Sequence, residues 1–138
     1  MPITNLEHFL VLTDDVAATR DFYRDVLGLT VGPRPPIAFA GYWMYAGSTP
    51  CVHIAERSGY GSYADPLEIP VSPDAPGTGP FDHVAFNASD FDEISERLER
   101  HGIRAHLNVV PGINLRQFFL FDPNGVKIEI NIPDQSAA

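Results

Sequence analysis

The chain has 138 residues, 44% of them hydrophobic, which is enough for one domain or for two small half-domains that share a core. Eighteen acidic residues against nine basic ones give a formal charge of −9, which disfavours nucleic acid and anionic membranes as partners. The single cysteine excludes an internal disulfide, no apolar run approaches the roughly 20 residues that span a bilayer, and the N-terminus lacks a signal-peptide pattern. We therefore expect a cytoplasmic protein.

The first half of the chain predicts one strand, one helix and further strands. Thr13 and Asp15 supply capping oxygens and negative charge to a helix with apolar residues at helical spacing, which ends at Gly28. The alternating patterns of the strands place His8 and His53 on polar positions opposite the apparent core side. The expected strands are residues 5–13, 37–46 and 51–55.

Residues 57–80 have no sustained periodicity and collect glycine, tyrosine and proline. This composition predicts a connecting loop, and loops of about 20 residues in compact domains are usually functional lids or linkers. We expect Gly59–Gly79 to form a lid or mouth over a groove.

The second half repeats the order of the first. A strand over residues 81–87 carries His83, and the run Ser89-Asp90-Phe91-Asp92 then resembles a capping box for a helix that stops at Gly102. Two more strands are expected at residues 104–110 and 115–122, joined by a turn at Pro111-Gly112, before a closing strand within residues 121–132.

The closing segment reads FDPNGVKIEINI, a turn followed by a strand of strict alternation. Ile128, Ile130 and Ile132 share one face, which predicts the core side. Glu129 lies on the opposite face, where a solvated strand surface is the simplest interpretation.

The spacing of polar residues in the two halves changes that interpretation. His83 follows His8, and Glu129 follows His53, by about 75 residues, which predicts two similar modules whose equivalent positions meet across a pseudo-twofold axis. If helices cover the core faces, the other faces line a concave groove where these side chains converge. Three imidazoles and a carboxylate are ligands that a borderline divalent ion accepts. The alternative is that each histidine is an isolated, satisfied residue on a half-buried strand.

Four segments together resemble the vicinal oxygen chelate superfamily: HFLVLTDDVAATRDFYRDVLGL, CVHIAE, FDHVAF and FDPNGVKIEINI. This superfamily includes glyoxalase I, methylmalonyl-CoA epimerase, fosfomycin-resistance enzymes, extradiol dioxygenases and bleomycin-resistance proteins. The resemblance implies an α+β fold in which two βαβββ modules form a cupped mixed sheet around a metal. It also implies that His8, His83 and Glu129 are metal ligands and that His53 occupies the variable fourth position.

The resemblance leaves the reaction open. Isomerase or lyase chemistry on a small oxygen-rich substrate chelated to a divalent transition metal (Fe, Mn, Ni, Zn or Co) is favoured, with His53 and Glu129 as catalytic residues. An Fe(II) or Mn(II) extradiol-type dioxygenase is an alternative, for which His106 is the nearest candidate for a further histidine. A non-catalytic binding protein of the drug-resistance type is a second alternative, against which the intact ligand set argues.

Two further expectations concern the surroundings of the site. Tyr42, Trp43 and Tyr45 are candidates to stack on a planar substrate, and Arg116 is a candidate to bind its charge, with Arg34 and Arg57 as other basic residues near a mouth. The resemblance also implies a homodimer, in which ligands from two chains complete each site. The expected organisation is a first module at 1–56, a connecting loop or lid at 57–80 and a second module at 81–138.

Overall fold

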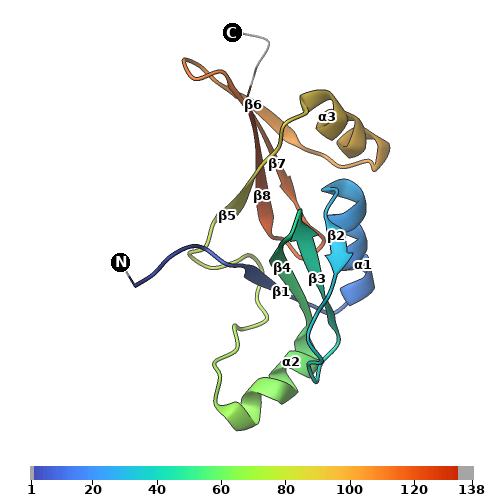
Figure 1. Ribbon diagram of the computed structural model, residues 1–138, viewed down its shortest axis with the longest axis vertical. Coiled ribbons are helices and arrows are strands. Elements are labelled where there is room, and N and C mark those ends of the chain that lie inside the picture. Colours follow the sequence, from blue (N-terminus) through green and yellow to red (C-terminus); the bar gives the residue numbers. More distant parts are fainter. Residues whose placement is uncertain (1, 134–138) are drawn as a thin grey trace. The chain divides into compact units, whose positions relative to one another are not determined.

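The computed structural model describes residues 2–133 and divides the chain into two compact units, Met1–Asp74 and Ala75–Ala138. Each unit is built around its own four-stranded mixed sheet and contains at least one helix, so the predicted α+β class with two modules is confirmed (Figure 1). The expected modules 1–56 and 81–138 lie in different units, and residues 1 and 134–138 of those ranges lie outside the described residues.

The first unit contains a sheet with the strand order β1-β4-β3-β2. β1 pairs parallel to β4, and the two remaining pairings, β4 with β3 and β3 with β2, are antiparallel. The strands are β1 (Phe9–Thr13), β2 (Thr30–Gly32), β3 (Gly41–Ala46) and β4 (Thr49–Glu56), and the helix between β1 and β2 comprises α1 (Val16–Asp21) and the π-helical η1 (Phe22–Val26).

The predicted helix begins where its capping residues require. A carboxylate oxygen of Asp15 accepts a hydrogen bond from the backbone N–H of Ala18 at 2.9 Å, and the hydroxyl of Thr13 accepts from the N–H of Asp15 at 3.1 Å. Tyr23 of the helix and Met44 and Ile54 of the sheet are almost fully buried and form the core. The three-residue β2 has no sequence prediction because it is too short to show an alternating pattern.

The expected loop at 57–80 is wrong for its first eight residues, which form helix α2 (Arg57–Ala64), followed by the single turn η2 (Asp65–Leu67). The sequence pattern does not predict this helix, because the glycines at 59 and 61 have low helix propensity. Packing compensates, since the rings of Tyr60 and Tyr63 lie 5.4 and 5.2 Å from that of Phe39. A Cβ at Gly59 would lie 3.0 Å from the Cβ of Phe39, so a larger residue there would have to displace Phe39.

The second unit has the same topology as the first, with the strand order β5-β8-β7-β6, a parallel β5–β8 pair and antiparallel β8–β7 and β7–β6 pairs. This equivalence confirms the internal repeat. The elements are β5 (His83–Asn87), α3 (Phe91–Arg100), β6 (His106–Val110), β7 (Leu115–Phe121) and β8 (Lys127–Pro133) (Figure 1).

The closing strand behaves as its alternation predicts. Ile128, Ile130 and Ile132 are 0, 3 and 1% exposed, on the face that α3 covers through the stacked rings of Phe91 and Phe118. The preceding turn is held by Asp122, whose carboxylate accepts hydrogen bonds from the backbone N–H groups of residues 124 and 126 at 2.8 and 2.9 Å. The face carrying Glu129 is thus turned away from the core of its unit. Among residues 2–133, no helix has the length and hydropathy needed to cross a bilayer.

Candidate metal centre

The first unit brings His8 and His53 together. His53 pairs with Leu10 in the β1–β4 register, and His8 lies two residues before Leu10 on the same side of the chain. Their imidazole rings stack face to face, with centroids 3.6 Å apart and planes inclined by 13°.

Trp43 covers the other side of His53. The two residues are paired in the β3–β4 register, and their rings stack with centroids 4.0 Å apart and planes inclined by 8°. His53 is 8% exposed, and its Nε2–H donates to the carbonyl oxygen of Pro50 at 3.1 Å. Burial lowers the pKa of His53, and the neighbouring His8 lowers it further, so the ring is neutral at pH 7. In that form the lone pair is on Nδ1.

The second unit brings His83 and Glu129 together at the equivalent place. Glu129 pairs with Ala85 in the β5–β8 register, and His83 lies two residues before Ala85, as His8 lies two residues before Leu10. Nε2 of His83 is 3.5 Å from Oε1 of Glu129, whose side chain is only 14% exposed.

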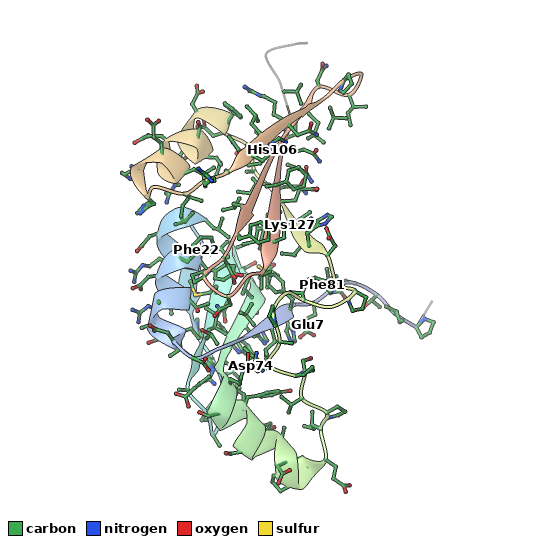
Figure 2. The ribbon with its side chains drawn as sticks, turned by 180° about the vertical axis from the view of Figure 1, so that it is seen from behind. Glu7, Phe22, Asp74, Phe81, His106 and Lys127 are labelled. Carbon is green, nitrogen blue, oxygen red and sulfur yellow. The ribbon has the colours of Figure 1, made fainter. Side chains whose placement is uncertain are left out.

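In each unit an acidic residue directly precedes the first histidine and holds its Nδ1 nitrogen. Oε1 of Glu7, just before β1 (Figure 2), lies 2.8 Å from Nδ1 of His8, and Oδ2 of Asp82 lies 2.7 Å from Nδ1 of His83. Accepting that proton leaves the lone pair of each imidazole on Nε2. The sequence carries this signal as EH and DH at equivalent positions of the repeat, although neither Glu7 nor Asp82 was predicted as a site residue.

The donor set fits a divalent transition metal. Two ligand atoms at about 2.1 Å from one ion and at a tetrahedral angle are about 3.4 Å apart, close to the 3.5 Å between His83 and Glu129, which is long for a hydrogen bond. The parallel rings of His8 and His53 do not suit a shared ion, because an ion in the plane of one ring lies outside the plane of the other. Within each unit, the described residues form no cluster of three or more His, Cys, Asp or Glu side chains suited to a metal.

The expected substrate-binding residues divide between the two faces of the sheets. Trp43 lies on the face of His53, and Tyr45, on the same side by alternation, donates its hydroxyl to the carbonyl of Pro33. Tyr42 lies on the opposite face, where its hydroxyl accepts from Arg20 at 2.9 Å and its ring lies under that guanidinium. Its expected stacking role therefore needs correction, because alternation separates adjacent aromatic residues and Met44 shows which side is the core.

The expectation for Arg116 also needs correction. Arg116 pairs with the buried Ile132, and its guanidinium lies 3.7 Å from the ring centroid of Phe91, on the face covered by α3 rather than on that of Glu129. The positive charge of Arg34 is a minor cause of the lowered pKa of His53, after burial and the neighbouring His8. Its guanidinium also donates to the carbonyl of Phe39 at 2.7 Å.

The fold agrees with what comparison with known proteins shows. The family model of the Glyoxalase/Bleomycin resistance protein/Dioxygenase superfamily matches residues 5–130, so the chain belongs to this superfamily.

Individual relatives cover nearly the whole chain. "Glyoxylase I 4" of Arabidopsis thaliana is 30% identical over 93% of this chain and 70% of its own length. The crystal structure of lactoylglutathione lyase from Agrobacterium tumefaciens matches with a TM-score of 0.69 and 25% identity over 95% of both chains. The fosfomycin resistance protein FosX of Listeria monocytogenes shares the fold at 14% identity, with a TM-score of 0.68 over 97% of both chains. One fold thus carries different chemistries, and the reaction has to be argued from the site.

Proposed function

We propose that the protein is a metal-dependent enzyme that binds a small oxygen-rich substrate through two adjacent oxygens on a divalent transition metal and carries out isomerase- or lyase-type chemistry. His8, His83 and Glu129 hold the metal, and His53 acts on the substrate. The observation that carries the proposal is the equivalent placement of His8–His53 and His83–Glu129, at the same register positions of two repeated sheets.

Each proposed ligand is prepared for its role by its own neighbours. Glu7 and Asp82 direct the lone pairs of the two histidines to Nε2, and Glu129 presents Oε1 beside Nε2 of His83. A divalent metal bound there supplies Lewis-acid stabilisation of negative charge that develops on a coordinated oxygen. Two imidazoles and one carboxylate leave coordination positions for substrate oxygens.

His53 is better suited to proton transfer than to coordination. Its ring is parallel to that of His8, which disfavours a shared ion, and it is held between His8 and Trp43 in one orientation. The hydrogen bond to Pro50 keeps a proton on Nε2, so Nδ1 is the atom that can accept a proton from a substrate. In this role Nδ1 of His53 would take a proton from the carbon next to a substrate carbonyl, and a metal held by His8, His83 and Glu129 would stabilise the negative charge that results.

The surroundings favour a compact substrate. Arg116 contacts Phe91 on the covered face, and Arg57 lies 3.7 Å from Asp74, so neither supports binding of a long anionic tail such as that of glutathione. Arg34, whose guanidinium donates to the carbonyl of Phe39, is our candidate to bind one negative group of a small substrate. Residues after Leu67, which keep the loop character expected of residues 57–80, remain our candidate for a lid.

The proposed site needs the His8–His53 pair of a first module and the His83–Glu129 pair of a second module. The second module can come from the same chain or from a second chain, and we propose the second arrangement, a homodimer with two metals.

Solvent hydrogen exchange tests this function. Protein stripped with a chelator and reloaded with Zn²⁺, Ni²⁺, Co²⁺, Mn²⁺ or Fe²⁺ is incubated in D₂O with small α-hydroxycarbonyl compounds, and with S-lactoylglutathione because of the lyase relative. Deuterium entering at the carbon next to the carbonyl, followed by NMR, should require both metal and His53. His101→Gln, at the exposed end of α3, is the control. Exchange that persists in the stripped protein contradicts the proposal.

One observation supports dioxygenase chemistry as a second candidate. His106 of β6 lies in the same row as Glu129, with Phe119 of β7 between them, and the rings of His106 and Phe119 are 6.4 Å apart. A histidine on that face can serve as the acid/base that catechol cleavage needs. Oxygen uptake by the Fe²⁺-loaded protein with catechols, lost in His106→Ala, would favour this function over isomerisation.

A further inference from the structure

A row of amide side chains crosses the sheet of the second unit beside Glu129. In the strand register Asn131 of β8 is opposite Gln117 of β7, and Gln117 is opposite Asn108 of β6. All three side chains are on the face of Glu129, because residues two apart on a strand share a face. His106 and Lys127, labelled in Figure 2, mark β6 and β8, the outer strand and the strand of Glu129.

Three hydrogen bonds join these side chains in one direction. Nδ2 of Asn108 donates to Oε1 of Gln117 at 2.8 Å, and Nε2 of Gln117 donates to Oδ1 of Asn131 at 3.0 Å. Nδ2 of Asn131 then donates to Oε2 of Glu129 at 2.8 Å. Each amide between the ends accepts with its oxygen and donates with its nitrogen.

The direction of the series is fixed by its last member. An ionised carboxylate only accepts hydrogen bonds, so the N–H₂ of Asn131 has to face Glu129 and its oxygen has to face Gln117. Turning one amide over would put two donors or two acceptors against each other, and hydrogen bonds in series strengthen one another. The orientation of the Asn131 amide is therefore set by Gln117 on β7 and, through Gln117, by Asn108 on β6.

The series also distinguishes the two oxygens of Glu129. Oε2 accepts from Asn131, whereas Oε1 lies 3.5 Å from Nε2 of His83. A glutamate side chain has three rotatable bonds, and a hydrogen bond to one oxygen selects one of its rotamers. The oxygen presented beside the histidine is thus the one that the amide does not engage.

We infer that Asn131 is a positioning residue for metal binding, held by Gln117 and Asn108, which turns Oε1 of Glu129 toward the metal and keeps Oε2 from it. This inference rests on the proposed function, since it gives the carboxylate of that site its orientation. It extends the determinants of metal affinity to Gln117 and Asn108, which do not bond to either residue of the His83–Glu129 pair. The competing explanation is structural, because cross-strand amide pairs also stabilise sheets.

Metal affinity separates the two explanations. The dissociation constant for Zn²⁺ is measured by competition with a chromophoric chelator for wild type, Asn131→Leu, Gln117→Leu and Asn87→Leu, alongside thermal unfolding. Asn87 is opposite Asn131 on β5 and lies outside the three bonds, so it is the matched control. We expect a loss of about 10–100-fold in affinity for Asn131→Leu, a smaller loss for Gln117→Leu and wild-type affinity for Asn87→Leu.

The outcomes for the inference and for the proposed function can be told apart. Wild-type affinity in Asn131→Leu, with metal bound normally by the unaltered protein, overturns the inference and leaves the proposed function standing. Equal losses in Asn131→Leu and Asn87→Leu that follow their melting temperatures also overturn it, in favour of the structural role. An unaltered protein that binds no metal overturns the proposed function.

A measurement that needs no metal tests the series of hydrogen bonds itself. In the stripped protein, Glu129→Ala should shift the side-chain amide NMR signals of Gln117 as well as those of Asn131, because the bonds are coupled. A shift confined to Asn131 would contradict the coupled series.

Discussion

The imidazole rings of His8 and His53 lie face to face, with centroids 3.6 Å apart and planes inclined by only 13°. An ion in the plane of the His8 ring would lie out of the plane of His53, so we propose different roles for His8, just before β1, and His53, in β4. The variants His8→Gln and His53→Gln should separate them.

We expect His53→Gln to retain bound metal and to lose about 10²–10⁴-fold in turnover, because the base is removed and the ligands remain. His8→Gln should lose metal and activity together. Elemental analysis and deuterium exchange on the same preparations measure both effects. Comparable metal loss in the two variants would instead make His53 a fourth ligand.

The carboxylate beside His83 should set its metal affinity. Asp82→Ala removes the acceptor of the Nδ1 proton and is expected to weaken metal binding by about 10–100-fold. Asp82→Asn keeps an acceptor oxygen and should recover most of the affinity. Lys127→Gln is the control. Nζ of Lys127 pairs with Oδ2 of Asp82 at 2.7 Å, so this variant removes the ion pair and keeps the carboxylate that holds Nδ1 of His83. If Asp82→Ala and Lys127→Gln weaken binding equally, the ion pair rather than the orientation of His83 matters.

The core face of β8 should carry a large share of the stability of the second unit. Ile128 is 0% exposed, and Ile128→Ala leaves a cavity that we expect to lower the free energy of unfolding by about 2–5 kcal/mol. Val109→Ala, at a residue that is 59% exposed, should change it by less than about 0.5 kcal/mol. Urea unfolding measures both. Similar small effects would show that Ile128 is not packed as described.

Local chemistry in the sequence predicted much of the fold. The alternation of Ile128, Ile130 and Ile132 and the capping oxygen of Asp15 act within a few residues, and the structure has each where expected. Helix α3 is capped by Asp90, one residue after the start of the predicted capping box. Helix α2 was missed because its glycines disfavour a helix and its stability comes from packing on Phe39, a contact between separate segments.

The sequence predicted the candidate site to a similar extent. The repeat indicated which histidines and which carboxylate to compare, because similar spacing in the two halves can be read from the sequence alone. Alternation separated Tyr42 from Trp43 but could not say which of two aromatic faces is the core. The series from Asn108 to Glu129 depends on the pairing register of three strands, which the sequence does not display.

Mixed dimers test whether the proposed sites are shared between chains. His8→Ala and Glu129→Gln subunits should each be inactive alone. If each site takes His8 from one chain and Glu129 from the other, one site of every heterodimer carries both defects and the other carries none. The heterodimers should therefore recover up to about half of the wild-type activity. Proven subunit exchange without recovery would place all the ligands of a site on one chain.

The most direct test of the proposed metal site is a metal titration of the stripped protein, with the bound ion counted by elemental analysis. We predict one divalent transition metal for each chain in the wild type, and loss of that stoichiometric binding in His8→Ala, His83→Ala and Glu129→Gln, whereas His101→Ala binds as the wild type does. Full metal occupancy in His8→Ala and Glu129→Gln would contradict it.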